Sequence, residues 1–277
     1  MKKLFTMIRR CEVEEVRKIL EKKPELIACT AKAPPKKDDG QSPLMVAIKS
    51  DNLEVAHLLL DFGADVNFVN GDEPLERYTI HAPIWDNALG QCFLRANHTV
   101  SEKSKVRTEG YFQLLCRLLD LGMDVNQELT CSLPTVYPKK AWRTTLDYYQ
   151  QSSLSAFSSH SEDTQREAQQ QLQAWTARIL EVLAAHGADI YDYHIREESS
   201  PLDDIDRIIR NLIFNRELRE GIRKLTEWEQ QNMPQWFEVK WRPMEAILRP
   251  YYAKDNPYYG VEVTPERRMF FERFVYE

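Results

Sequence analysis

Apolar side chains recur with a helical period in three stretches of the chain. In residues 55–62 they follow the spacing i, i+3, i+4 and i+7, which places them in one stripe along a helix. Residues 112–119 and 179–183 carry the same kind of stripe. The pattern predicts three amphipathic helices that each turn one face toward a core.

A glycine follows each of these predicted helices. Gly63, Gly122 and Gly187 open the phrases GADVN, GMDVN and GADI. Glycine readily adopts the left-handed backbone conformation at which helices commonly stop. We therefore expect the three glycines to end the three helices and the residues after them to turn the chain outward.

A second recurring phrase marks the start of a helix. Residues 39–40 (Asp-Gly) predict a turn, Ser42 is a favourable N-cap, and Pro43 suits the first helical position. Three weaker versions of this phrase occur, at residues 82–85, 144–147 and 200–203. Because start phrases and glycine phrases alternate, the chain is predicted to contain repeated pairs of helices.

This alternation resembles the ankyrin repeat most clearly in residues 39–67, which contain a turn, an inner helix, a short loop, an outer helix and a Gly-Ala-Asp ending. Residues 3–27 resemble an ankyrin capping unit, with an inner helix over 3–10 and an outer helix over 14–22. Divergent third, fourth and fifth repeats are suggested by residues 81–126, 144–190 and 200–225. The resemblance implies an all-α ankyrin-repeat solenoid of about five helix-turn-helix units.

The later predicted units are longer than an ordinary ankyrin unit of about 33 residues. The predicted units cover residues 3–38, 39–80, 81–143, 144–199 and 200–225, and residues 226–277 follow them. The excess is expected in long finger loops at 68–81 and 127–143, and in insertions between inner and outer helices at 95–110 and 151–173. Such insertions resemble those of a divergent bacterial type of ankyrin protein.

Residues 150–173 are rich in Gln and Ser. The first part, residues 150–161, is predicted to form a loose polar loop. From Thr164 the sequence favours a helix that continues to His186.

The last residues of the chain differ in composition. Residues 233–277 are rich in aromatic side chains, residues 236–241 alternate like a short strand, and Thr264 precedes a predicted final helix. The end of a solenoid exposes an apolar face and needs a cap. The tail is therefore predicted to be an aromatic-rich C-terminal cap, and a separate binding module is the alternative.

Charge and cysteine usage bear on the class of partner. Residues 1–40 hold 11 Lys and Arg against 7 Asp and Glu, so their net charge is +4. Because the net charge of the whole chain is −6, residues 41–277 carry −10. An acidic body disfavours nucleic acid and suits a protein partner with a basic surface.

The five cysteines lack a C-x-x-C spacing, and no apolar run is long enough for a membrane span. We expect a cytoplasmic protein that is monomeric when free.

The sequence contains no recognisable catalytic or metal-binding motif. Its six histidines show no metal-ligand spacing, and no P-loop or nucleophile-elbow pattern is present. The acidic group Asp203, Asp204 and Asp206 suits the first turn of a helix better than a site. We therefore expect no enzyme activity, no metal and no cofactor, and an enzyme site within residues 226–277 is the remote alternative.

The resemblance places partner binding on a concave face lined by inner helices and finger tips. Tyr, Trp and Arg dominate the energetics of interfaces. The predicted contact residues are Arg77, Tyr78, Trp85, Asp86, Tyr137, Trp142, Arg143, Tyr148, Tyr191 and His194. For Trp85 a place in the core is the alternative, and Lys139 and Lys140 are interpreted as a solvated loop.

The predicted function is a binding scaffold. The leading hypothesis for its role is an immunity protein that neutralises a bacterial toxin, and a secreted effector that binds a host protein is the alternative.

Overall fold

The computed structural model describes residues 1–70, 80–96, 102–131, 138–156 and 162–189, together with Ile247 and Tyr251. The chain forms two compact units, Met1–Tyr148 and Tyr149–Glu277. Within the described residues the secondary structure is mostly helical, with eight α-helices and three short strands. None of the helices in these ranges combines the length and the apolar character that crossing a bilayer requires.

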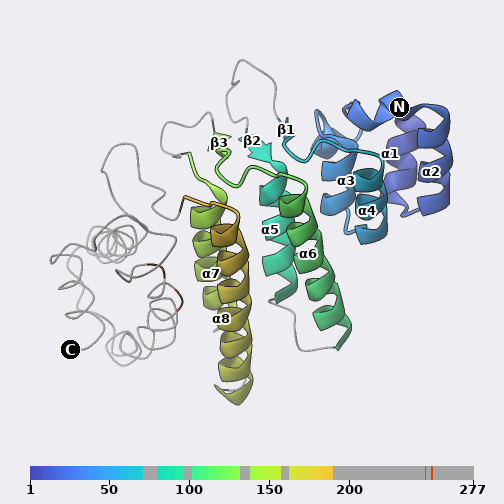
Figure 1. The fold of residues 1–277 in the computed structure, drawn as a ribbon. Coiled ribbons are helices and arrows are strands. Elements are labelled where there is room, and N and C mark those ends of the chain that lie inside the picture. Colours follow the sequence, from blue (N-terminus) through green and yellow to red (C-terminus); the bar gives the residue numbers. More distant parts are fainter. Residues whose placement is uncertain are drawn as a thin grey trace, which may run out of the picture. The chain divides into compact units, whose positions relative to one another are not determined.

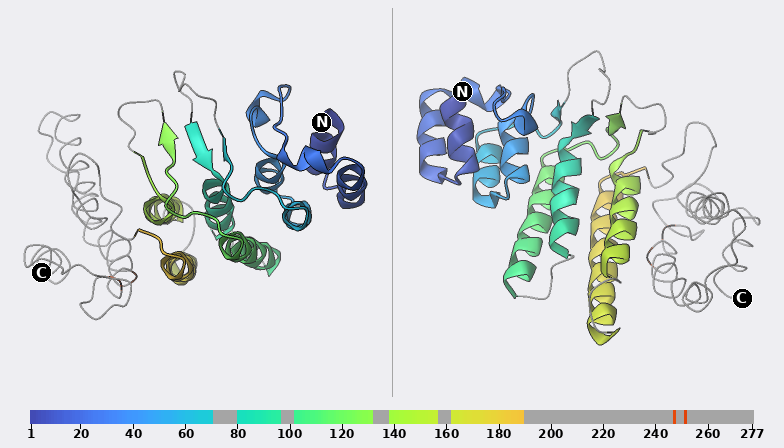
Figure 2. Two further views of the ribbon diagram at one scale, coloured as in Figure 1. Left: turned by 45° about the horizontal axis from the view of Figure 1, so that its top comes forward. Right: turned by 180° about the vertical axis from the view of Figure 1, so that it is seen from behind.

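The first unit is built from successive helical hairpins (Figure 1). The helices are α1 (Lys2–Arg9), α2 (Val13–Lys22), α3 (Pro43–Lys49), α4 (Leu53–Asp61), α5 (Ile84–Ala96) and α6 (Glu102–Asp120). The first helix of each hairpin packs on the first helix of the next, so α1, α3 and α5 form an inner row. The second helices, α2, α4 and α6, form an outer row in the same way. The strands lie on the side of the inner row (Figure 2).

The start of α3 follows from its local sequence. Oγ of Ser42 accepts a hydrogen bond from the Met45 backbone N–H at 3.2 Å, and Pro43 occupies the first turn. The next residues of α3 through Ile48 are buried. The predicted N-cap is confirmed, and the burial shows why a helix forms here: a capped start precedes an apolar run that continues to Ile48.

The three helix-ending glycines have the predicted conformation. Gly63, Gly122 and Gly187 have φ values of 79°, 87° and 78°. The residue after each glycine donates its N–H back into the preceding helix, to Leu59, Leu118 and Leu183 respectively. These hydrogen bonds satisfy carbonyls that would otherwise lack partners at a helix end.

The fingers of the first unit form a small antiparallel sheet. Its strands are β1 (Val69–Asn70), β2 (Ile80–Pro83) and β3 (Thr130–Cys131), in the order β1-β2-β3. Val69 is opposite Pro83, and Ile80 is opposite Cys131. The sheet therefore joins strands from consecutive fingers, and the expectation of an all-α fold must be corrected to a mostly helical fold with a finger sheet.

Asn67, from the first glycine phrase, links two consecutive repeats. Its Oδ1 accepts a hydrogen bond from the Asp124 N–H at 2.7 Å, and its Nδ2 donates to the Gly122 carbonyl at 3.0 Å. Nε2 of Gln127 donates to the Asn67 carbonyl at 3.2 Å. The repeated sequence phrase thus makes contacts between repeats as well as ending helices.

The long segments predicted as insertions mostly lengthen helices. α5 continues to Ala96, and α6 already begins at Glu102. The helix α7 (Ala141–Ala156) includes residues 150–156, so the polar loop predicted over 150–161 is wrong for that part. α7 also begins before the predicted start phrase at residues 144–147.

In the second unit the described residues include the end of α7 and all of α8 (Glu162–Ala185). One face of α8 is buried through Leu172, Ile179 and Leu183, and the guanidinium of Arg178 lies 5.2 Å from the ring centre of Trp175. The helix predicted from Thr164 is confirmed. The fifth unit at 200–225 and the aromatic tail lie outside the described residues, apart from the buried Ile247 and Tyr251.

Candidate protein-binding surface

Half of the predicted contact residues fall within the described ranges. Trp85 and Asp86 lie in the first turn of α5, and Trp142, Arg143 and Tyr148 lie in α7. The remaining five lie outside the described residues, namely Arg77, Tyr78, Tyr137, Tyr191 and His194.

Three of the predicted contact residues are buried. The Trp85 side chain is 0% exposed, and its Nε1 donates a hydrogen bond to the Gln127 carbonyl at 3.0 Å. Trp142 is also 0% exposed, and Arg143 is buried beside it in the first turn of α7. The sequence interpretation placed Trp142 and Arg143 in a finger, but the helix begins at Ala141 and turns both inward. The structure therefore buries the side chains of Trp85, Trp142 and Arg143, which the sequence predicts as contact residues.

Asp86 and Tyr148 lie together although they are far apart in sequence. The Tyr148 hydroxyl donates a hydrogen bond to Oδ1 of Asp86 at 3.0 Å. Its ring stacks on Phe93 with ring centres 5.6 Å apart. A Cβ atom at Gly90 would lie 3.4 Å from the Tyr148 hydroxyl, an ordinary van der Waals contact, so this hydroxyl lies close to the backbone of α5. Two predicted contact residues thus form one polar pair between α5 and α7.

The Asp86 carboxyl group is electrostatically perturbed. Burial raises its pKa above the ordinary value of 3.8, against the opposing effects of the Tyr148 hydrogen bond and the Lys139 charge. Burial also raises the pKa of Tyr148, and the neighbouring Asp86 charge adds to that rise. Within the described residues, Oδ2 of Asp86 accepts no hydrogen bond.

Lys139 completes this group of side chains. Its Nζ lies 2.5 Å from Oδ2 of Asp147, and its backbone pairs with Leu129 within the finger at residues 127–143. The sequence interpretation treated Lys139 as a solvated loop residue, because no sequence signal showed that its partner would be Asp147 on the next helix. We call Asp86, Lys139, Asp147 and Tyr148 the inner-face cluster. With two carboxyl groups and one ammonium group, it is suited to accept hydrogen bonds from a cationic side chain.

Comparison with known proteins identifies one repeat. Residues 39–71 match the family model of the ankyrin repeat. No protein of curated function matches the sequence of the chain. The matched stretch contains α3, α4 and β1, and it packs between the hairpins α1–α2 and α5–α6. The chain therefore contains an ankyrin repeat at the position where the sequence phrases are most complete.

Proposed function

We propose that this chain is a non-catalytic scaffold that binds a protein partner on the face formed by its inner helices and fingers. The ankyrin repeat at residues 39–71 carries the proposal, because ankyrin repeats are protein-interaction modules and are typically non-catalytic. The repeat packs against helical hairpins on both sides, which provides a continuous inner row of helices for a partner.

The inner-face cluster supports a partner with a basic surface. Asp86 is a half-buried carboxyl group whose Oδ1 accepts a hydrogen bond from Tyr148. A Lys or Arg side chain of the partner would form a charge-assisted hydrogen bond with Oδ2 of Asp86. The net charge of −10 on residues 41–277 would steer such a partner toward the chain.

The role that best fits this chemistry is immunity against a bacterial toxin. Toxin domains that cut nucleic acid need basic surfaces to bind phosphates, so an acidic inner face would cover such a surface. An effector role toward a host protein is the second candidate. The gene beside this one separates the two roles, because a neighbouring toxin gene favours immunity and a secretion locus favours an effector.

The proposal is tested by affinity capture of the full chain from its native cells. We expect one stoichiometric protein partner with a basic surface, and slower association as salt rises, because the Debye length falls to about 8 Å at physiological ionic strength. The double variant Asp86→Ala/Tyr148→Phe should weaken that complex by at least about tenfold, equivalent to about 1.4 kcal/mol. The matched control is Gln113→Ala, a change at an exposed position on α6.

Two results would contradict the proposal. Capture of no protein, together with turnover of a small molecule by the purified chain, would exclude the scaffold function. A captured partner that binds the double variant as tightly as the unmodified chain would move the contact surface away from the inner-face cluster.

A further inference from the structure

The first finger, residues 29–41, has a defined conformation. The Ala31 N–H donates to the Gln41 carbonyl at 2.8 Å, and the Gly40 N–H donates to the Ala31 carbonyl at 2.9 Å. Inside this closure, Oδ1 of Asp39 accepts the Ala33 N–H at 2.9 Å. A loop held in this way presents its side chains with little entropy left to lose on binding.

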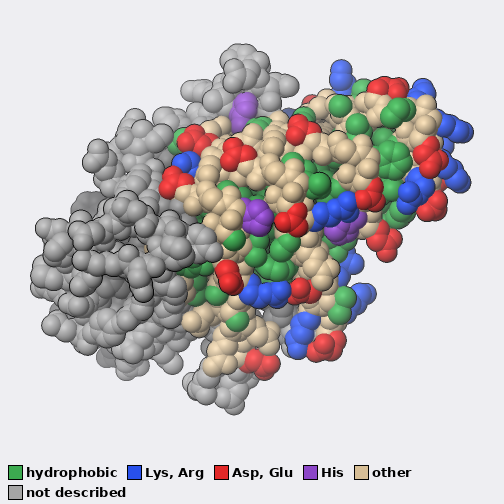
Figure 3. Space-filling model, in the orientation of Figure 1, with side chains coloured by type: hydrophobic (Ala, Val, Ile, Leu, Met, Phe, Trp, Pro, Cys, Tyr) green, Lys and Arg blue, Asp and Glu red, His purple; other side chains and the backbone are tan. Residues whose placement is uncertain are grey.

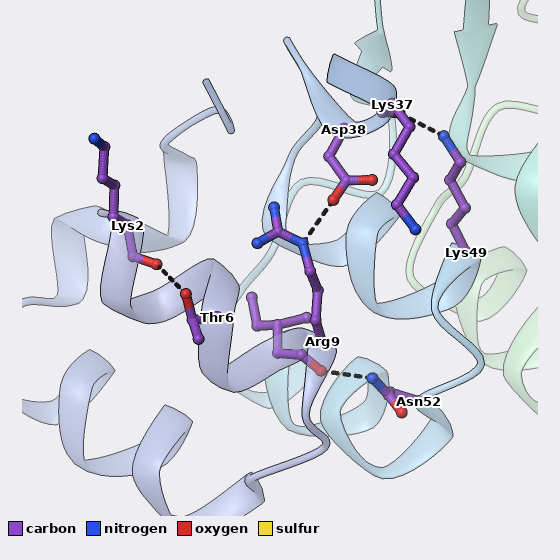
Figure 4. Close-up of polar contacts among 8 residues, drawn as sticks. Lys2, Thr6, Arg9, Lys37, Asp38, Lys49 and Asn52 are labelled. Atoms are coloured by element: carbon purple, nitrogen blue, oxygen red, sulfur yellow. Dashed lines mark hydrogen bonds and ion pairs between the residues drawn. The ribbon is translucent and has the colours of Figure 1, made fainter. Parts of the chain in front are cut away.

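The two acidic residues of the finger are both engaged with the chain. Asp38 is only 2% exposed, and its Oδ2 accepts a hydrogen bond from Nε of Arg9 at 2.7 Å (Figure 4). This ion pair neutralises the Asp38 charge. Asp39 is exposed but uses one carboxylate oxygen for the Ala33 N–H. Asp39 is therefore the single exposed carboxylate in residues 29–41, all of which the structure describes.

The finger carries exposed lysines that its acidic residues do not offset. Lys32, Lys36 and Lys37 are all exposed. Lys49, exposed at the end of α3, donates its Nζ to the Lys37 carbonyl at 2.7 Å, which holds a fourth ammonium group against the finger (Figure 4). We call Lys32, Lys36, Lys37 and Lys49 the first-finger basic surface.

The sign of this surface is opposite to that of the rest of the chain. Residues 1–40 carry +4, whereas residues 41–277 carry −10. In the space-filling view, Lys and Arg side chains gather with Asp and Glu at the N-terminal end of the first unit (Figure 3). A partner that was basic everywhere would be repelled at the first finger, since like charges brought together across an interface oppose binding.

We infer that the first-finger basic surface docks an acidic peptide segment of a protein partner. Four ammonium groups beside one exposed carboxylate favour carboxylate side chains by charge complementarity. A peptide is favoured over nucleic acid because the charge of −10 on the rest of the chain would repel a long polyphosphate, whereas a short acidic segment meets only the finger. This surface lies outside the inner-face cluster and takes a ligand of opposite charge, so the inference goes beyond the proposed function.

The test uses the full chain and a fluorescein-labelled peptide of alternating Glu and Ala, with binding followed by fluorescence anisotropy. A Lys-Ala peptide and a single-stranded oligonucleotide of similar length serve as comparison probes. We expect the Glu-Ala peptide to bind most tightly, and its affinity to fall as salt is added. The variant Lys36→Glu/Lys37→Glu should weaken this binding at least about tenfold.

A charge-matched control separates the finger from the overall field. Lys22→Glu/Lys103→Glu changes the net charge by the same amount at exposed lysines on α2 and α6, and should alter binding less than about twofold. Circular dichroism of each variant confirms that it is folded. Equal losses in the two variants, preferential binding of the oligonucleotide, or absence of peptide binding would each overturn the inference.

The outcome is distinguishable from that of the proposed function. A native partner captured equally by the unmodified chain and by Lys36→Glu/Lys37→Glu would leave the scaffold function standing and contradict docking at the finger. Peptide binding that depends on Lys36 and Lys37, with no partner captured from cells, would support the finger surface and contradict the scaffold function.

Discussion

The hydroxyl of Tyr148 donates a hydrogen bond to the carboxylate of Asp86 at 3.0 Å, across 62 positions of sequence. The bond joins α7 to the first turn of α5 on the inner-helix side. Burial raises the pKa of Asp86, which means that the folded chain disfavours the ionised form of this side chain. A carboxyl group kept where its charge is unfavourable is a common property of binding sites.

Replacing Asp86 with Asn should stabilise the fold at neutral pH. Because the folded pKa of Asp86 is raised above 3.8, the folded state holds more protons than the unfolded state above that pH. Stability is therefore lost as pH rises through the raised pKa, and Asn avoids this loss while its amide oxygen still accepts from Tyr148. We expect a higher Tm for Asp86→Asn near pH 7, measured by thermal denaturation. The difference should vanish when the pH is below 3.8, and a lower Tm at neutral pH would contradict it.

Replacing Tyr148 with Phe should cost about 1 kcal/mol of unfolding free energy, because it removes the hydroxyl donor of the half-buried Asp86 carboxylate. The ring and its stacking on Phe93 are kept. The matched comparison is Tyr111→Phe, which removes a 2.8 Å hydrogen bond to Asp51. Asp51 still has its ion pair with Arg107, so this second change should cost less. Urea denaturation measures both values, and a larger loss for Tyr111→Phe would contradict the expectation.

The pairing of His57 with Arg117 should make the chain less stable in mild acid. Nη1 of Arg117 lies 3.1 Å from Nδ1 of His57, and arginine can only donate, so Nδ1 accepts. Burial, and then the Arg117 charge, lower the pKa of His57 below 6.5. The unfolded state therefore binds more protons as pH falls below 6.5, and stability is lost over that window.

The test of this pairing is His57→Asn, in which the amide oxygen replaces Nδ1 as acceptor without a titrating group. We expect the unmodified chain to lose more stability than His57→Asn when the pH is lowered from about 7.5 to about 5.5, around the usual His pKa. Urea denaturation at the two pH values gives the comparison. Equal losses in the two proteins would show that His57 does not contribute to the acid sensitivity.

Two glycine substitutions should have different effects on the stability of the fold. Gly122 has φ of 87°, and a Cβ atom there would meet nothing within 4 Å, so Gly122→Ala suffers only backbone strain, about 1 kcal/mol. Gly90 lies inside α5 without a positive φ, and helix interiors favour Ala over Gly by roughly 0.5–1 kcal/mol. Its new Cβ would touch the Tyr148 hydroxyl at 3.4 Å, an ordinary contact. We expect Gly122→Ala to lower the urea midpoint and Gly90→Ala to keep or raise it. A urea midpoint that fell for Gly90→Ala but not for Gly122→Ala would contradict this expectation.

Local sequence was sufficient to predict the parts of the fold that depend on a few neighbouring residues. The cap at Ser42 and the stops at Gly63 and Gly122 all follow from hydrogen bonds or backbone angles within one helical turn. The ankyrin repeat matched at residues 39–71 consists of such local signals placed in order, and it was predicted over 39–67.

The candidate surface depended on contacts between distant segments, and there sequence reasoning was only partly successful. Asp86 and Tyr148 were named from residue type, but their bond exists because the inner helices bring positions 62 residues apart together. Trp142 was placed in a finger, and the structure buries it because α7 begins earlier than its start phrase indicates. The sequence favours a solvated Lys139, whereas in the structure its ammonium group pairs with Asp147. A side chain's type is written in the sequence, but its burial and its partners are decided by which helices pack against it.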